Sequence, residues 1–397
     1  MRHLKRKTVF PLLLFIVTLV ASSCGNSTAS ADNSNMIALT NCIVIDGTGI
    51  PSINDGVILI RGDKIEKAGS SSDITIPNGC IKMDLGGRTV MPGFINAHVH
   101  KAYDETNLKN WLNAGVTTVR DESPRIADFI SFRDENNKRS DTARIISATP
   151  ILSVTGGYGN DFFTSADEAE SKVKDYINKN VDIIKISIED YQQGRPWSMP
   201  TKAETKAMAD AAHAGNKKVS VHITHEKYLQ WAIDIGVNDL AHMVVEPIDK
   251  EICQKIIEKD IYWEPTLELW TGISEMYSLN WDKIAIENLS VFYQSGGKIA
   301  LGTDFAGYTC KFDNGFPITE VKKMKEAGMS NMDIIVSGTL NAAHVCDRDK
   351  ELGSLEAGKI ADILVVGGKP LENIEDLQNT YMVIHNGQIA FTADTKE

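Results

Sequence analysis

Residues 92–106 read PGFINAHVHKAYDET, an apolar segment that runs into two histidines, His98 and His100. Side chains two positions apart on a β-strand point to the same side, so a strand over residues 94–98 would direct both imidazoles toward one point. Such a pair suits a metal ion, but His-x-His is too common a pattern to establish a metal site by itself. What this stretch means therefore depends on the strands that follow it.

The apolar segments after this one alternate with amphipathic segments of helical period. The strand-like segments are GVTTVRD (115–121), ARIISATP (143–150), VDIIKIS (181–187), KVSVHIT (218–224), DLAHM (239–243), IYWEPTL (261–267) and KIALGTDF (298–305). Helix-like segments, with Ser, Thr or Asp near their starts, include 165–180, 201–215 and 249–260. Eight βα repeats in roughly 250 residues predict an α/β fold with a (β/α)8 TIM barrel. A doubly wound sheet is the alternative, but no GxGxxG follows the first strand.

The two ends of the chain have a different sequence pattern, without the helix-like segments of the middle part. Short strand-like segments separated by Gly- and Asn-containing turns occupy residues 36–92, and the same pattern returns in GKIADILVVGG and TYMVIHNGQIAFT. We therefore expect residues 36–92 and 349–397 to pair in one small β-sandwich domain, with the barrel occupying residues 93–348.

Polar residues recur at the ends of the predicted barrel strands. These residues are His98 and His100 on the first strand, Lys185 on the fourth, His222 on the fifth, His242 on the sixth and Asp304 on the eighth. Each has an ordinary structural alternative, such as a core histidine, a helix cap or a buried ion-pair lysine. A barrel brings the carboxyl ends of its strands to one face, so the six together predict one site. Lys185 also lies in an apolar run, where a bare ammonium needs a partner or a chemical modification.

This order of residues resembles the amidohydrolase superfamily of metal-dependent hydrolases. The segments RTVMPGFINAHVH, GVTTVRD, IALGTDF and GSLEAGKIADILVV resemble its members too, over about residues 38–392. The elements GVTTVRD and TGGYG are most similar to the branch that contains imidazolonepropionase-like proteins and Xaa-Pro dipeptidases, which are prolidase-like enzymes.

The resemblance implies a binuclear metal centre. His98, His100 and Asp304 would hold one divalent ion, His222 and His242 the other, and a carboxylated Lys185 would bridge the two. Zn²⁺ is the expected ion, and the ligand types are also compatible with Mn²⁺, Fe²⁺ or Co²⁺. A hydroxide that bridges the metals would attack an amide carbonyl, and Asp304 would carry the proton to the leaving nitrogen. The implied activity is that of a dipeptidase or prolidase-like enzyme, with a cyclic amidase of imidazolonepropionase or hydantoinase type as the alternative.

Two other classes of function are less compatible with the residues. Deaminases of the superfamily usually carry HxxE after the fifth strand, whereas His225 lies three positions after His222 here. A non-catalytic envelope binding protein would have lost ligands, and this chain keeps all six.

Candidate substrate contacts are Tyr158, in a GGYG stretch where relatives commonly have GGHG, and three residues after the fourth and fifth strands: Tyr191, Arg195 and His225. Arg195 would suit a substrate carboxylate.

The N-terminus is expected to direct the protein to the bacterial cell envelope. Residues 1–23 combine a cationic start, an apolar run and small residues before Cys24, which resembles a lipoprotein signal peptide with Cys24 as the lipidated residue. The apolar run is shorter than the ~20 residues that a membrane-spanning helix requires. Residues 24–35 would form a flexible tether, so the membrane is contacted through the lipid only.

The composition narrows the range of partners. The net charge of −12 argues against a nucleic-acid partner, since no basic stripe is available to replace phosphate counterions. A small or peptide-like amide is the partner that the family resemblance implies. The sequence does not determine the oligomeric state.

Five cysteines besides Cys24 form no CxxC motif, so we expect them to be buried or unpaired: Cys42, Cys80, Cys253, Cys310 and Cys346.

Overall fold

The computed structural model describes residues 35–192 and 194–393. The described residues belong to one compact unit, Asn33–Glu397. The predicted signal peptide, Cys24 and the tether up to residue 34 lie outside the described residues. Within the described ranges, no helix is both long and apolar enough to cross a membrane. The five described cysteines are all free, three of them buried and two partly buried.

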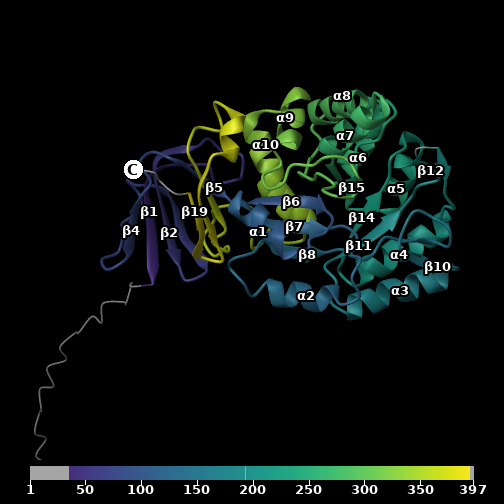
Figure 1. Cartoon of the computed structure of the whole chain (residues 1–397), viewed down its shortest axis with the longest axis horizontal. Coiled ribbons are helices and arrows are strands. Elements are labelled where there is room, and N and C mark those ends of the chain that lie inside the picture. The colour runs from purple at the N-terminus through teal and green to yellow at the C-terminus, as the bar shows by residue number, and fades with distance from the viewer. Residues whose placement is uncertain (1–34, 193, 394–397) are drawn as a thin grey trace, which may run out of the picture. The chain divides into compact units, whose positions relative to one another are not determined.

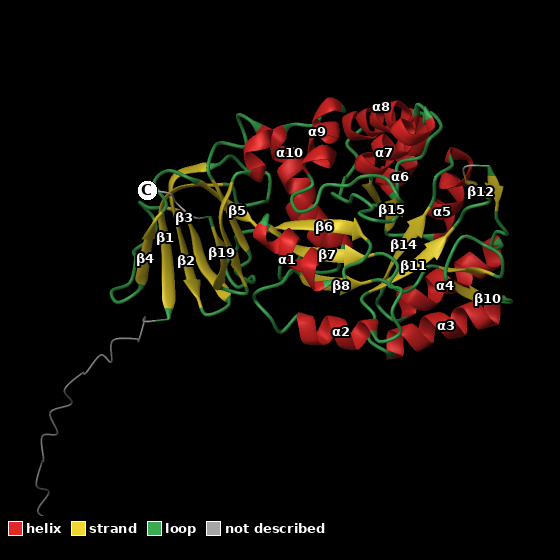
Figure 2. Ribbon diagram, in the orientation of Figure 1, coloured by secondary structure: helices red, strands yellow, loops and turns green. Residues whose placement is uncertain are grey.

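Strands from both chain ends share one mixed eight-stranded sheet (Figures 1 and 2). In spatial order its strands are β19 (Gln388–Thr392), β18 (Thr380–His385), β17 (Ile363–Val366), β5 (Thr89–Pro92), β1 (Met36–Val44), β2 (Ile53–Arg61) and β3 (Lys64–Ser70), with β4 (Ile81–Asp84) paired to β1. Strand β5 joins the two ends, because Val90 pairs with Val44 on one side and with Val365 on the other. The two ends thus fold together as predicted. The strands form one continuous sheet, so the division into two sandwich layers stays a prediction, as do the domain boundaries.

Most strands between these ends are parallel and make two further sheets. One sheet contains β6 (Phe94–Val99), β7 (Val116–Asp121) and β8 (Arg144–Ser147). The other contains β10 (Asp161–Phe163), β9 (Leu152–Val154), β11 (Ile183–Ser187), β14 (Lys218–His222), β15 (Asp239–Ala241) and β16 (Tyr262–Glu264). A separate hairpin is formed by β12 (Tyr191–Gln192) and β13 (Arg195–Pro196). Strands β9, β10, β12 and β13 were not among the eight expected strands.

The eighth expected strand, 298–305, is not a regular strand. Isolated parallel bridges join Ile299 to Trp263 of β16 and Phe305 to Val99 of β6, and a third bridge joins the two parallel sheets. Asp304 has a φ of 59°, which turns the backbone out of the extended conformation. The parallel strands therefore do not form one closed hydrogen-bonded ladder. The α/β fold is confirmed, and the closed barrel stays a prediction.

Helices connect the parallel strands, and Figure 2 shows several of them beside the strands that they follow. The α-helices are α1 (Glu105–Asn113), α2 (Phe129–Asn136), α3 (Ala166–Asn178), α4 (Lys202–Ala214), α5 (Leu229–Ile235), α6 (Lys250–Glu258), α7 (Leu267–Tyr277), α8 (Trp281–Gln294), α9 (Ile318–Glu326), α10 (Asn331–Val336) and α11 (Ala342–Val345). Short helical turns are η1 (Glu226–Tyr228), η2 (Ser337–Asn341) and η3 (Ile374–Gln378). The Ser, Thr and Asp residues near the predicted helix starts act as N-terminal caps. Ser165 caps α3, Asp249 caps α6, and Thr201 with Glu204 forms a capping box on α4.

Candidate metal centre

Three of the predicted ligands converge where β6 and the segment 298–305 end. Asp304 Oδ1 lies 2.9 Å from His100 Nε2 and 3.2 Å from His98 Nε2. The backbone holds this arrangement, because the Asp304 N–H donates to the His98 carbonyl at 2.8 Å. The potential ligand atoms of all three residues lie within 4.8 Å of one another. Although burial acts in the opposite direction, the imidazoles of His100 and His98 hold the pKa of Asp304 well below its usual range.

His222 and His242, at the ends of β14 and β15, extend the cluster. The His242 ring centroid lies 4.8 Å from that of His98 and 4.8 Å from that of His222. His242 Nδ1 is 3.0 Å from Thr266 Oγ1, which fixes the orientation of the ring. Burial lowers the pKa of both histidines well below the usual value. Neutral imidazoles have a free ring nitrogen, which is the state that binds a metal ion.

Lys185 reaches the same region from β11, with its side chain buried. Its Nζ forms an ion pair with Glu122 and donates to Ser220 Oγ at 3.2 Å. Ser220 Oγ in turn donates to Glu122 Oε2 at 2.9 Å. The unmodified lysine is therefore a buried ion-pair member, which is one of the two states expected for it. All six predicted ligands gather in one region, and their role as ligands stays a prediction.

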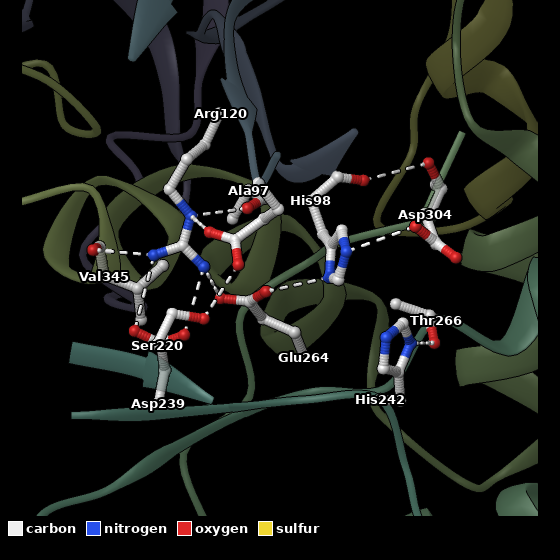
Figure 3. A network of polar contacts seen from close by, with 12 residues as sticks. Ala97, His98, Arg120, Ser220, Asp239, His242, Glu264, Thr266, Asp304 and Val345 are labelled. Carbon is white, nitrogen blue, oxygen red and sulfur yellow. Dashed lines mark hydrogen bonds and ion pairs between the residues drawn. The ribbon is translucent and has the colours of Figure 1, made fainter. Parts of the chain in front are cut away.

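A buried network of charged side chains beside this cluster was missed by the sequence reasoning (Figure 3). Arg120 Nε is 2.7 Å from Glu122 Oε1, its Nη2 is 3.1 Å from Asp239 Oδ1, and it also pairs with Glu264. Glu264 Oε2 is 3.4 Å from His98 Nδ1, and burial raises the pKa of this carboxyl group above its usual value. Charged residues in the apolar segments GVTTVRDE and IYWEPTL were a signal that could have revealed this network.

A cavity of about 660 Å³ adjoins the cluster. Its aromatic lining residues are Tyr191, Trp270, Tyr277, Trp281 and Tyr308. Trp270 connects the cavity to the cluster, because it lines the cavity and its ring also meets that of His242 edge to face, with centroids 5.9 Å apart. Aromatic side chains of this kind bind apolar groups and leave polar tips available for hydrogen bonds.

The four predicted substrate contacts lie in different environments. Tyr158 stacks on His222 with centroids 4.0 Å apart, and Tyr191 and His225 line the large cavity. His225 is held on both sides, because Nδ1 is 2.5 Å from Glu246 Oε1 and Nε2 is 2.7 Å from the Tyr191 carbonyl. The hydrogen bond that His225 makes to the Glu246 carboxylate, which acts as the acceptor, raises the pKa of His225 to about 9. Arg195 packs over the Trp197 ring at 3.8 Å and is not among the residues that line this cavity.

Comparison with known proteins identifies the family. The amidohydrolase family matches residues 89–390, which is most of the chain. The chain belongs to the amidohydrolase family. As an amidohydrolase it is an enzyme that hydrolyses C–N bonds, as the sequence predicted.

Relatives of this amidohydrolase have different activities. It is 23% identical to an ochratoxinase from Aspergillus niger over 90% of this chain and 86% of the relative. A 5′-deoxyadenosine deaminase from Methanobrevibacter smithii is 21% identical over 91% of each chain. The crystal structure of a Xaa-Pro dipeptidase with methionine in its active site matches with a TM-score of 0.78 and 25% identity, covering 89% of this chain and 99% of that one. The family rests on the match over residues 89–390, and these more distant similarities leave the specific substrate open.

The residues of this amidohydrolase fit the divalent metal that the superfamily usually uses. In the described part of the chain, several buried atoms of the cluster form no hydrogen bond of good geometry: His98 Nδ1, His100 Nδ1, His222 Nε2, Glu264 Oε2 and Asp304 Oδ1. Some of these atoms approach other members of the cluster only as close ion pairs, as the contacts of His98 with Glu264 and Asp304 show. Buried polar atoms without partners are costly in a folded protein. Imidazole nitrogens and carboxylate oxygens are ligands of divalent transition metals, so a bound ion would satisfy atoms of this set.

Proposed function

We propose that this amidohydrolase is a metal-dependent dipeptidase of prolidase-like type that cleaves a peptide-like amide. The observation that carries the proposal is the convergence of His98, His100 and Asp304, with His222 and His242 in ring contact beside them. The aromatic cavity next to His242 offers space for an apolar side chain of such a substrate.

The chain's own residues divide the work as follows. His98, His100 and Asp304 would hold one ion, His222 and His242 would hold a second, and a carboxylated Lys185 would lie between the two. Metal bound there would polarise the amide carbonyl and lower the pKa of water. Asp304 would accept a proton from the attacking water and deliver it to the leaving nitrogen. Tyr158 and Trp270 would exclude bulk water from His222 and His242, on which they pack.

Carboxylation of Lys185 changes the charge of its surroundings. The lysine would exchange its ammonium for an anion beside Glu122, and Arg120 would remain as the counter-charge of Glu122. Two neighbouring anions repel, so we expect the carbamate to persist only where metal compensates its charge. The mass of the intact protein, measured with and without metal, would show whether one CO₂ is gained and lost with the ions.

Metal content and activity together test the proposal. Wild-type protein should contain divalent metal, expected to be zinc, and should cleave dipeptides, Xaa-Pro among them, faster than hydantoins or imidazolones. His98→Ala and Lys185→Ala should lose both metal and activity, whereas the exposed His213→Gln should keep both. Full activity and metal content in the His98 and Lys185 variants would contradict the assignment. Faster turnover of the cyclic amides would point to a cyclic amidase instead.

The proposed cellular location has a separate test. We propose that Cys24 is lipidated after removal of residues 1–23 and that the lipid alone anchors the protein to the cell envelope. Wild-type protein should incorporate labelled palmitate and sediment with membranes, whereas Cys24→Ala should do neither. A Cys24→Ala variant that still sediments with membranes would contradict the lipid anchor.

A further inference from the structure

A second cavity, of about 260 Å³, shares His100 with the candidate metal centre. Its lining includes two cations, Lys101 and Arg125, whose side chains are exposed. Among the described residues, neither of them forms an ion pair with a carboxylate. An exposed guanidinium next to a reaction centre is available to a ligand, because no counter-ion of the protein itself occupies it.

The two acids of this cavity are already engaged by backbone N–H groups. Asp104 caps α1 and accepts from the N–H groups of Thr106 and Asn107 at 2.8 and 3.2 Å. The Asp121 carboxylate accepts from the N–H groups of Ala102 and Ser123 at 3.0 and 2.9 Å. These carboxylates therefore hold the surrounding backbone in place, and the two cations line the cavity with no ion-pair partner in the part of the chain that the structure describes.

The cavity that Arg125 lines places it beside the candidate metal centre, because His100 lines the same cavity. The chain as a whole carries a net charge of −12, so an unpaired cation here contrasts with its general charge.

We propose that Arg125, with Lys101 beside it, binds the free carboxylate of the substrate, while an apolar group on the acyl side occupies the aromatic cavity. This inference rests on the proposed amide hydrolysis and narrows its substrate class. The preferred substrates are dipeptides and N-acyl amino acids with a bulky apolar acyl group and a free carboxylate. A guanidinium can bind a carboxylate through two parallel hydrogen bonds, which also fixes the direction of the amide. Arg125 replaces Arg195, which packs on Trp197, as the residue for this role.

The test compares two ligands that differ only at the carboxylate. Metal-loaded enzyme is assayed with 3-phenylpropanoyl-alanine and with its alaninamide counterpart, which lacks the negative charge. We expect wild-type enzyme to prefer the acid, and Arg125→Gln to reduce kcat/KM for the acid about 10- to 100-fold more than for the amide. Arg125→Lys should keep part of the preference, because the charge remains and the bidentate geometry is lost. The surface variant Arg139→Gln serves as the matched control and should retain the wild-type preference.

A binding measurement separates this inference from the proposed function. Ketomethylene isosteres of the same two compounds cannot be hydrolysed, and calorimetry gives their affinities for the metal-loaded protein. Tighter binding of the acid isostere to wild type, lost in Arg125→Gln at unchanged metal content, supports the carboxylate site even if no amide is cleaved. An unchanged acid preference in Arg125→Gln, or its loss in Arg195→Gln instead, would overturn the proposal. Hydrolysis of acid and amide at equal rates by wild type would overturn it and leave the proposed function standing.

Discussion

Glu122 joins two positively charged side chains beside the candidate metal centre. One of its oxygens lies 2.7 Å from Arg120 Nε, and the other pairs with Lys185 and accepts a hydrogen bond from Ser220. The side chains of Glu122, Arg120 and Lys185 are all almost completely buried. Because an unpaired buried ammonium is costly, Glu122 is the residue that makes an unmodified Lys185 tolerable in its apolar strand.

Glu122→Gln should therefore destabilise the metal-free protein. The substitution leaves buried cations with less counter-charge, and breaking a buried ion pair typically costs about 3–5 kcal/mol. Urea unfolding monitored by circular dichroism measures the loss. The exposed pair of Glu135 with Lys138 supplies the control, since Glu135→Gln should hardly move the midpoint. An increase in stability would indicate that Lys185 already carries the carbamate.

The His225–Glu246 pair gives a pH dependence with a defined sign. The folded-state pKa of His225 is raised to about 9, mainly by the hydrogen bond with Glu246. A raised pKa contributes stability that is complete below the unfolded value of about 6.5 and is lost as the pH rises through about 9. Because the pair is partly solvent-exposed, we expect less than about 1 kcal/mol. The difference in unfolding free energy between wild type and His225→Gln should shrink as the pH rises from about 6.5 to about 9. The imidazole NMR signal of His225 should titrate near the upper end of this pH range.

The segment 298–305 and the turn after it position Asp304. Its bridges to β16 and β6 place it between the two parallel sheets, and Gly307 donates its N–H to the Asp304 carbonyl at 2.8 Å. A Cβ on Gly307 would lie 2.1 Å from Asp304 Oδ1. The carboxylate can therefore keep its position only if residue 307 has no side chain.

Gly307→Ala should displace the Asp304 carboxylate while leaving the fold intact. We expect at least a tenfold loss of metal affinity and activity, as when a neighbour that orients a metal ligand is changed. Equilibrium dialysis with zinc measures the affinity, and thermal melting of the metal-free protein checks the fold. Gly69→Ala is the matched control, because a Cβ there meets Ile74 at an ordinary 3.5 Å. Equal zinc affinity in both variants would show that the turn does not constrain Asp304.

At the scale of the whole molecule, one buried ion pair ties the eight-stranded sheet to the parallel strands. Arg144 of β8 pairs with Asp362, which precedes β17, and donates to Thr118 Oγ1 of β7 at 3.0 Å. Asp362 also lies 3.1 Å from His385 Nδ1 of β18. Burial alone would raise the pKa of Asp362, but Arg144 and His385 hold it below its usual range. The chain's C-terminal end is thereby fixed to the part that carries the candidate metal centre.

Asp362→Asn should destabilise the whole unit by about 3–5 kcal/mol, since Arg144 would remain buried without its partner. A lowered carboxyl pKa contributes stability above the unfolded value of 3.8 that is lost only as the pH falls below it. The difference in unfolding free energy between wild type and variant should therefore be the same at pH 7 and pH 5. The control Asp210→Asn removes an exposed pair with Lys206 and should have little effect. A separate early unfolding step would show that the sheet unfolds independently.

Much of the site was predictable because its residues follow strand ends. His98, His100, Lys185, His222, His242 and Asp304 could be found from the repeating pattern of apolar segments. Glu122 and Glu264 were missed because a charged residue in or beside a strand shows no partner in the sequence. Arg125 was missed for a different reason: it lies in an irregular loop, and only the cavity that it shares with His100 distinguishes it from other loop arginines.

The sequence by itself determined the α/β class, the pairing of the two chain ends and the set of candidate ligands, because strand periodicity and residue chemistry are local properties. Tertiary structure alone decided that Lys185 pairs with Glu122 and that Arg195 packs on Trp197. It also decided that Arg125 and Lys101 line a cavity beside His100, where neither has an ion-pair partner among residues 35–192 and 194–393. Ion pairing and cavity shape depend on distances between segments far apart in the chain, and these distances are set only when the core packs.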